Sequence, residues 1–445
     1  MTAARNVLAL VAVTLVAYAA SGGTAFQYDD FRVIVDDSRV HSWSAWAASM
    51  PGMRALTKAT YVLNWSDPAV PRTFAWTGVA IHVACALAVL ALARRWIPAM
   101  APACPRPEAA ALVCALVFAL HPAQTEAVVY AAARSTSLSS LATLLGLYAW
   151  ERARDGSRGA WIAATIVALA ASLASREAAW ILPFAVVLVE MARGSRVRDA
   201  FIRSAPLWIA LIAFAALGFT IAAHRQLLAS SLSVRSPLEN LVAQVDAVTY
   251  LVTHPLATLR VNFDPDLVAR EATDASWWAK LACIGAYFAI AFAQLRRRPW
   301  LAFSMLWLAL ALLPTHGVLA RLELANDRQL HLAMAGPGLA VGVALASMSA
   351  RRIATGVAIG LVAILGVATF VRVGDYASES RLWRATVEAS PMNARAWNNL
   401  GYALAAEGDR AGARTAYERA LALDPASPRA RGNLDALERA SGMTR

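Results

Sequence analysis

The chain has 445 residues, of which 59% are hydrophobic and 16% are charged, whereas soluble domains average roughly 45–50% and about 25%. This composition excludes an ordinary soluble protein and predicts a membrane protein. The net charge of +12 comes almost entirely from arginines in small clusters. That dispersal argues against a nucleic-acid partner, because nucleic-acid-binding proteins gather Lys and Arg on one face. The four cysteines share no CxxC spacing, which excludes a disulfide scaffold.

Eleven segments are apolar enough to cross a bilayer, which takes about 20 residues. They cover approximately residues 6–25, 74–93, 109–128, 135–150, 159–175, 178–192, 201–223, 276–295, 299–315, 330–349 and 353–371. The sequence therefore predicts an all-α polytopic membrane helix bundle of about 11 spans over residues 1–372. The first segment is alternatively a cleavable signal, because the small residues Ala17 to Ala20 follow its apolar stretch.

Arginine placement predicts the orientation, since short cytoplasmic loops collect Lys and Arg. With the N-terminus inside, the alternate loops carry the arginines of residues 94–106, 152–158, 193–203, 296–298 and 351–352. An odd number of spans then places the tail outside, together with two long loops, 26–73 and 224–275. The apolar segment 241–259 would reverse the later loops if it crossed, so we interpret it as an interfacial or re-entrant helix. We expect an inner (plasma) membrane protein with a cytoplasmic N-terminus and an extracytoplasmic tail.

The tail from Asp375 onward has a helical period, and Pro391 and Pro425 stand 34 residues apart, which is the tetratricopeptide period. With Trp397 at position 4 of the repeat, small residues fill the positions where paired helices approach, namely Gly401, Ala413 and Ala420. The sequence predicts a repeat domain over 375–445, with one full repeat at 394–427 between two half repeats. Its contacts should lie mostly within the stack.

Two interpretations of this tail stay open from the sequence. It is either a rigid cap on the membrane domain or a concave surface that binds a peptide acceptor, with Asn398 and Asn399 as candidate acceptor-binding residues. Repeat folds specify a shape rather than a ligand, so the pattern does not choose between them.

The first external loop opens with Asp29 and Asp30. A carboxylate there could act as general base toward an acceptor hydroxyl, while a lipid-linked substrate holds its phosphate at headgroup level. Adjacent residues in an extended segment point to opposite sides, so only one should face the substrate. Such a pair on a loop is also a common solvated turn.

Further polar residues recur at the same predicted membrane face, where ionisable groups are functional candidates. Arginines there could hold a phosphate by charge-assisted hydrogen bonds, or could serve as structural ion pairs and interface anchors. The candidate phosphate contacts are Arg54, Arg134, Arg176 and Arg328, and further candidates are His121, Glu126 and Glu177. No metal is expected, because these carboxylates and His121 do not make a ligand set of the required count.

The order of these motifs resembles the transmembrane and tetratricopeptide-repeat O-mannosyltransferases of the GT-C class, in a bacterial form. The matching pieces are Tyr28-Asp29-Asp30, Arg54 with Asn64, the motif His121-Pro-x-x-Thr-Glu-Ala-Val128 with Arg134, Arg176-Glu177, the segment Asn262-Phe263-Asp264 and the repeat tail. The resemblance implies a GT-C-like fold, Asp29 and Asp30 as catalytic carboxylates, and the four arginines as donor-phosphate contacts. It departs from the family pattern at Ala55 (usually proline), at Ser135 to Ser137 (usually with an acidic residue) and at His331 and Ala333 (a tyrosine-proline pattern).

The expected function is that of an integral-membrane glycosyltransferase. It would move a mannose-like sugar from a polyprenyl-phosphate donor to an acceptor hydroxyl at the extracytoplasmic membrane face, with a protein as the favoured acceptor. No cofactor is expected beyond the lipid-linked sugar as co-substrate, and the expected partners are membrane lipid, that donor and a peptide or protein acceptor. The alternative is a non-catalytic membrane-anchored scaffold for envelope assembly. A transporter is less favoured, since the spans are strongly apolar in their middles.

Overall fold

The computed structural model describes residues 2–253, 261–267, 273–317, 320–321 and 323–442. Within these residues every regular element is a helix. The bundle contains α1 (Thr2–Ala17), α2 (Trp43–Ala48), α3 (Ala55–Asn64), α4 (Pro71–Met100), α5 (Pro107–Leu120), α6 (Thr125–Val129), α7 (Arg134–Arg152), α8 (Arg158–Ser175), α9 (Leu182–Ala192), α10 (Val197–Arg203), α11 (Ala205–Thr220), α12 (Ala222–Val234), α13 (Pro237–Thr253), α14 (Ala275–Gln294), α15 (Pro299–Leu312), α16 (Leu330–Ala333), α17 (Ala335–Ser347) and α18 (Arg351–Asp375). The tail contains α19 (Glu379–Ala389), α20 (Ala394–Ala406), α21 (Arg410–Leu423) and α22 (Pro428–Gly442).

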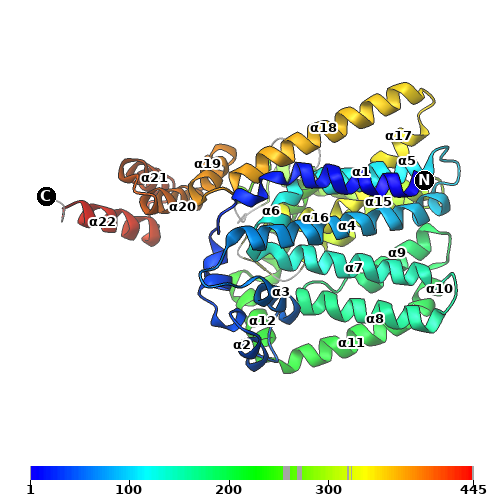
Figure 1. Ribbon diagram of the computed structural model, residues 1–445, viewed down its shortest axis with the longest axis horizontal. Helices are drawn as coiled ribbons and strands as arrows, with labels where there is room; N and C mark the ends of the chain where they lie inside the picture. Colours follow the sequence, from blue (N-terminus) through cyan, green and yellow to red (C-terminus); the bar gives the residue numbers. More distant parts are fainter. Residues whose placement is uncertain (1, 254–260, 268–272, 318–319, 322, 443–445) are drawn as a thin grey trace.

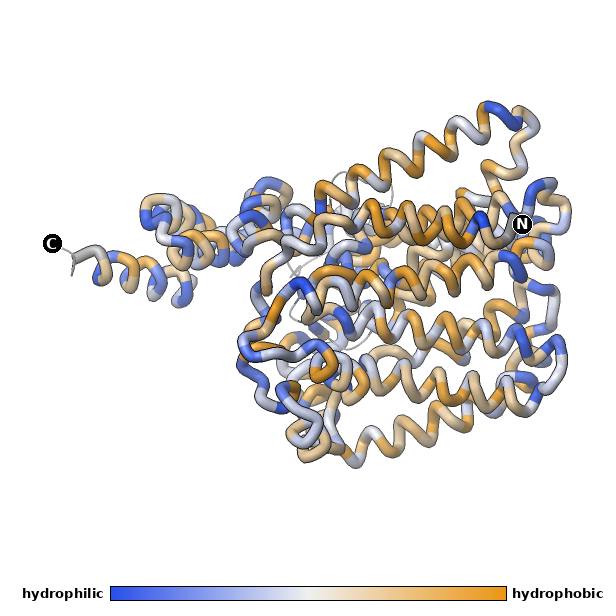
Figure 2. The backbone as a smooth tube through the Cα atoms, in the orientation of Figure 1, coloured by the Kyte–Doolittle hydropathy of each residue, from blue (hydrophilic) through white to orange (hydrophobic). Residues whose placement is uncertain are grey.

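The long helices of the bundle run side by side and the tail projects from one end (Figure 1). Apolar residues cover the helices along their length, while hydrophilic residues gather at the helix ends and in the tail (Figure 2). Helix α5 lies against α4 and α17 in the middle of the bundle, and its Cys114 and Phe118 are buried. This distribution is the one expected of helices whose surroundings are apolar.

Five described helices are long and apolar enough to cross a membrane, or up to eight candidate spans if each of three bent helix pairs counts as one. The predicted count of eleven therefore remains a prediction. Two predicted spans are short helices, α9 and α15. A third, α7, carries buried hydroxyls along its length, and the Thr143 and Ser172 hydroxyls meet across the α7–α8 contact at 3.0 Å.

The two ends of the bundle differ in charge. At one end, which we call the arginine-rich end, ion pairs join the turns after α4, α7 and α9, through Arg95–Asp155 and Arg193–Glu151. The N-terminus lies at this end (Figure 1). The other end, which we call the tail-side end, carries most of the predicted external loops 26–73 and 224–275, which are largely helical and contain α2, α3, α12 and α13. The predicted interfacial helix corresponds to α13, which is not among the candidate spans.

The tail begins without a linker, because α18 continues to Asp375 and only Tyr376 to Ser378 separate it from α19. The predicted domain boundary at 372–375 thus lies in the last turn of α18. Helices α20 and α21 pack closely, since a Cβ on Gly401 would lie 2.6 Å from ring carbons of Tyr417. This contact explains why the repeat requires a small residue at that position.

Helix α19 faces the bundle rather than only its own stack. The Trp383 ring, which is 3% exposed, contacts the Phe263 ring edge-on at 5.3 Å and the Tyr28 ring at 5.7 Å. Asn262 donates to the Ser390 hydroxyl at 2.6 Å. The contacts of the tail helices thus lie mostly within the stack, as expected, but α19 also contacts the bundle through Trp383 and Ser390.

Candidate functional site

A small pocket lies where α19 and α20 meet the tail-side end of the bundle, and we call it the Asp29 pocket. Four stretches of the bundle and two helices of the tail form its walls. Its lining residues are Tyr28, Asp29, Glu126, Tyr130, Phe263, Asp264, Glu323, Arg328, Trp383, Arg395 and Asn399. Of the residues predicted from the sequence, it brings together Asp29, Glu126, Arg328 and Asn399.

The position of Asp29 is set by contacts with distant parts of the chain. The Ala25 N–H donates to the Tyr376 carbonyl at 3.0 Å, and the Tyr28 N–H donates to Glu379 Oε1 at 2.6 Å. Tyr28 has a left-handed backbone with φ of 34°, which turns the chain so that the Asp29 N–H donates to Tyr130 Oη at 3.1 Å. The Asp29 side chain remains 35% exposed, so a substrate can reach its carboxylate.

Asp30 has a different environment from its neighbour. It is 1% exposed, and its two carboxylate oxygens accept from the Gln27 N–H at 2.9 Å and the Ala132 N–H at 2.6 Å. Burial raises the pKa of Asp30 to about 7, although both backbone donors act to lower it. One member of the pair therefore faces the pocket, and the other ties the loop to the segment before α7. Alternation in an extended chain is not the reason, because Asp29 and Asp30 have a helical backbone.

Ion pairs occupy most charged groups of the Asp29 pocket. Arg328 pairs with Glu126 at 3.4 Å and with Glu323 at 2.8 Å, and Arg395 Nε donates to Asp264 Oδ2 at 2.9 Å. The pocket thus holds four carboxylates and two guanidinium groups. Among the described residues, Asp29 forms an ion pair only with the exposed Arg32, at 3.5 Å, although the charge of Arg328 also acts on it. It is therefore the pocket carboxylate that is best placed to accept a proton from a substrate.

A second group of charges lies beside this pocket, and we call it the basic cluster: Arg54, Arg176, Arg321 and Glu177. Arg54 pairs with Glu177 at 2.6 Å. Burial, which favours the neutral acid, is outweighed by Arg54, so the pKa of Glu177 is lowered to about 2. Arg176 is buried and donates to the Thr136 hydroxyl. Its pKa is lowered by burial and by the positive charges of Arg321, Arg54 and Arg328.

Arg321 was not expected from the sequence, although it stands close to Arg328 in the chain. It forms no ion pair among the described residues, and burial and the Arg328 charge lower its pKa. Three arginines and one glutamate leave the basic cluster with an excess of two positive charges. Buried cations without partners are costly unless an anion compensates them, so the cluster is suited to bind one.

The structure places Arg134 and His121 away from both groups of charges. Arg134 is 1% exposed; its Nη1 donates to the Thr60 carbonyl at 3.1 Å and its Nη2 to the Phe74 carbonyl at 2.9 Å. Those contacts are structural, and a contact of Arg134 with the donor phosphate stays a prediction. His121 is buried at the end of α5, where its Nδ1 accepts from the Ala123 N–H at 3.3 Å, and it also stands outside the pocket lining.

The repeat supplies part of the pocket wall. Arg395, Asn398 and Asn399 lie one turn apart on one face of α20. Asn433 donates to Asn398 Oδ1 at 3.0 Å, and Asn398 donates to Asn399 Oδ1 at 3.2 Å. Asn399 Nδ2 is buried and has no hydrogen-bond partner in the described residues. Both asparagines were expected from the sequence, whereas Arg395, Trp383 and Tyr130 were not.

No group of three or more His, Cys, Asp or Glu side chains that could hold a metal ion occurs in the described part of the chain.

The comparison with known families identifies one segment. Residues 394–427 match the tetratricopeptide repeat family, which confirms the predicted repeat with the predicted bounds. No curated protein and no solved structure matches the chain. The confirmed repeat covers only 394–427, so it establishes the tail's architecture and leaves the reaction, the donor and the acceptor as proposals.

Proposed function

We propose that this chain is an integral-membrane glycosyltransferase that transfers a sugar from a polyprenyl-phosphate donor to an acceptor hydroxyl. The observation that carries the proposal is the side-by-side arrangement of an acidic pocket with an available carboxylate, Asp29, and a basic cluster with Arg321, which is unpaired among the described residues. Sugar transfer from a phosphate requires both: a base for the acceptor proton and positive charge for the departing phosphate.

In the proposed reaction the acceptor oxygen attacks the anomeric carbon of the sugar while the bond from that carbon to the phosphate oxygen breaks. The hydroxyl proton passes to Asp29. The released phosphate keeps the bonding electron pair and is stabilised by the basic cluster, chiefly Arg176 and Arg321. Arg328 lies between the two groups, since its charge affects both Arg176 and Arg321, and it keeps Glu126 and Glu323 paired.

The acceptor is proposed to be a peptide or protein. An extended peptide offers alternating N–H and C=O groups, which carboxamide side chains can match. The row Asn433–Asn398–Asn399 leads to the pocket and ends on the buried Asn399 Nδ2, which has no partner in the described residues. Its position supports presentation of an acceptor hydroxyl to Asp29 by the repeat.

The proposed location is the inner membrane, with the arginine-rich end in the cytoplasm and the tail outside. The candidate spans support this location, and so does the position of the arginine-rich end, which lies at the end of the bundle opposite the tail. Reporter fusions after Arg298 and after Arg445 should report inside and outside respectively. An inside signal at Arg445 would contradict this orientation.

The activity is tested by incubating the purified protein with a panel of labelled polyprenyl-phosphate sugars and a peptide acceptor. Asp29→Asn keeps the shape of the side chain but removes its basicity, so turnover should fall about 10²–10⁴-fold. Asp36→Asn, on the same loop and exposed, is the matched control and should turn over normally. Arg176→Ala and Arg321→Ala should weaken both donor binding and turnover.

A scaffold without catalysis is the second candidate. It is favoured by the ion pair Arg395–Asp264, which would hold the tail to the bundle whether or not a substrate binds. The pairs Arg328–Glu126 and Arg328–Glu323 would in the same way stabilise the bundle beside it. If no donor in the panel is consumed, or if Asp29→Asn and Asp30→Asn both match the unmodified protein, this second candidate replaces the first.

A further inference from the structure

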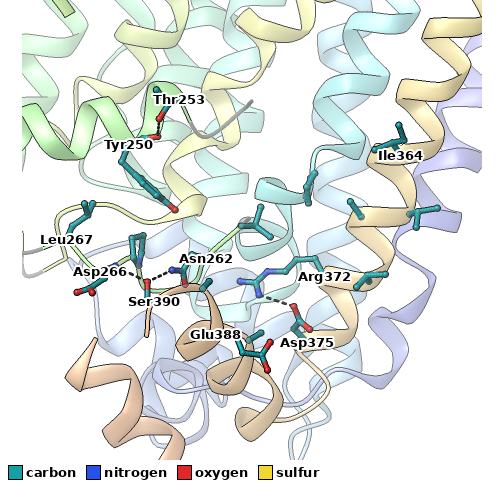
Figure 3. A pocket seen from close by; sticks show the side chains of 18 of the residues that line it. Tyr250, Thr253, Asn262, Asp266, Leu267, Ile364, Arg372, Asp375, Glu388 and Ser390 are labelled. Carbon is teal, nitrogen blue, oxygen red and sulfur yellow. Dashed lines mark hydrogen bonds and ion pairs between the residues drawn. The ribbon is translucent and has the colours of Figure 1, made fainter. Parts of the chain in front are cut away.

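A large groove lies between the tail and the bundle. Segment 261–264 separates this groove from the Asp29 pocket. The groove lies between the end of α13, the described segment 261–267, the outer half of α18 and α19, and its volume is about 1320 Å³. Small-molecule sites typically measure about 300–1,000 Å³, so this groove can hold a larger ligand. Figure 3 shows that its side chains come from all four of these segments.

One wall of the groove is apolar and belongs to a candidate membrane span. It consists of the side chains that α18 presents over two turns, among them Ile364, Val367 and Val371, which are 57%, 65% and 63% exposed. Helix α18 is one of the five candidate spans, and only 17% of its most apolar window is buried inside the protein. The groove is therefore continuous with a helix surface that acyl chains of the bilayer would cover.

The rest of the lining is polar and carries more negative than positive charge, and part of it belongs to the last turn of α18 itself. Arg372 contributes one guanidinium group, and Asp266, Asp375 and Glu388 contribute three carboxylates. Arg372 is 5% exposed; its Nη1 donates to Asp375 at 3.0 Å, whereas its Nη2 is buried with no partner in the described residues. The guanidinium group extends from α18 into the groove, above Asp375 and Glu388 (Figure 3).

These features define the ligand by its chemistry. Arg372 Nη2 requires an acceptor such as a phosphate oxygen, since guanidinium groups bind phosphate through charge-assisted hydrogen bonds. The excess of two carboxylates disfavours a purely anionic head group and favours one that also carries an ammonium. The apolar wall requires acyl chains. A single molecule that meets all three conditions is a phospholipid with a primary amine.

We propose that this groove binds an aminophospholipid of the phosphatidylethanolamine type. Its acyl chains lie along α18, its phosphate accepts from Arg372 Nη2, and its ammonium pairs with Glu388 or Asp266. The lipid would join α19 to α18 at the level of the headgroups. It would also contact Asn262, whose neighbours Phe263 and Asp264 line the Asp29 pocket. This site is independent of the proposed transferase activity.

The test uses the full chain in detergent, titrated with defined lipids and read by native mass spectrometry. Phosphatidylethanolamine should be retained in preference to phosphatidylglycerol, which lacks the ammonium, and to phosphatidylcholine, whose quaternary amine has no N–H to donate. An exposed charge pair contributes up to about 1 kcal/mol. A lipid that lacks one headgroup contact of phosphatidylethanolamine should therefore bind about 2–5-fold more weakly. This comparison needs no variant and does not depend on any donor sugar.

Variants locate the site. Glu388→Gln combined with Asp266→Asn should abolish the preference for phosphatidylethanolamine, and Arg372→Lys should weaken the binding of every phospholipid. Glu407→Gln, an exposed tail carboxylate outside the groove, should bind like the unmodified protein. Equal binding of the three lipids, displacement of phosphatidylethanolamine by polyprenyl phosphate at equal concentration, or an unchanged preference in the Glu388 and Asp266 variant would each overturn the proposal.

Discussion

Replacing Trp383 with alanine should release the tail from the bundle. The side chain is 3% exposed and contacts the rings of Phe263 and Tyr28. Truncating a buried tryptophan to alanine typically costs about 3–5 kcal/mol. The polar contacts that would remain between tail and bundle include Tyr28–Glu379, Asn262–Ser390, Asp266–Ser390, Asn393–Asp264 and Arg395–Asp264. Each contributes about 0.5–1.5 kcal/mol, so together they are comparable with the loss.

The release can be followed by hydrogen exchange of the full chain. The Tyr28 N–H donates to Glu379 and the Asp266 N–H donates to the Ser390 hydroxyl, so both amides are protected only while α19 is docked. A loss of about 3 kcal/mol or more corresponds to at least about 100-fold faster exchange at these amides. The amides inside α20 and α21 should keep their protection, because the repeat has its own packing.

Two further variants separate undocking from damage to the repeat. Trp383→Phe keeps an aromatic ring and should change exchange at Tyr28 far less. Trp397→Ala removes a tryptophan whose Nε1 donates to the Pro391 carbonyl within the tail, so it should loosen the repeat itself. The reasoning is refuted if Trp383→Ala leaves Tyr28 and Asp266 as protected as before while the repeat stays folded.

Three other predictions concern single residues. Arg134→Ala should lower the thermal unfolding temperature, at a cost of about 1.5–3 kcal/mol for each hydrogen bond lost from the buried charge, without a selective loss of donor affinity in a titration of the folded fraction. The Arg54–Glu177 pair stabilises the fold fully above pH 4.5, the ordinary pKa of a glutamate, and this stabilisation is lost as the pH falls toward the lowered pKa of Glu177, about 2. The unfolding temperatures of the unmodified protein and of Glu177→Gln should therefore differ above about pH 5 and converge near about pH 2. Gly401→Val should unfold the repeat, seen as lost helical circular dichroism, because the added carbons overlap Tyr417.

Each of these has its own contrary outcome. A normal unfolding temperature for Arg134→Ala with weaker donor binding would restore a phosphate role for that arginine. A difference in unfolding temperature that stays constant across the pH range would show that pairing with Arg54 does not lower the pKa of Glu177. Gly432→Ala is the control for the repeat, since nothing lies within 4 Å of its added Cβ; equal damage from both glycine variants would refute the packing argument.

The repeat was predictable because its requirements are local. A period of 34 residues, small residues such as Gly401 where helices cross, and the prolines Pro391 and Pro425 in the turns after α19 and α21 are all visible in the sequence. The number of spans was less predictable, since short helices such as α9 and the hydroxyl-rich α7 do not pass a length and hydropathy test. Apolar character alone does not distinguish a helix that faces lipid from one that is enclosed by others.

The site was predictable only in part. Alternation along the chain predicts that one of Asp29 and Asp30 faces inward, but which one depends on bonds to Glu379 and Tyr376, about 350 positions away in the sequence. For Arg134, residue type and position at a membrane face do not reveal that two backbone carbonyls already bind its guanidinium group. Arg321 belongs to no motif in the sequence, and its proposed role in the basic cluster follows only from the charged side chains around it in the structure.

The tail's two interpretations from the sequence, a rigid cap or a peptide-binding surface, do not exclude each other in the structure. Trp383 and Arg395 fix the tail to Phe263 and Asp264, as a cap would, and the same contacts place Asn399 in the wall of the Asp29 pocket. Docking therefore sets the distance between the asparagine row and Asp29. If the proposed transfer occurs, undocking by Trp383→Ala should reduce activity on a peptide acceptor more than it reduces donor binding, because the basic cluster contains no residue of the tail.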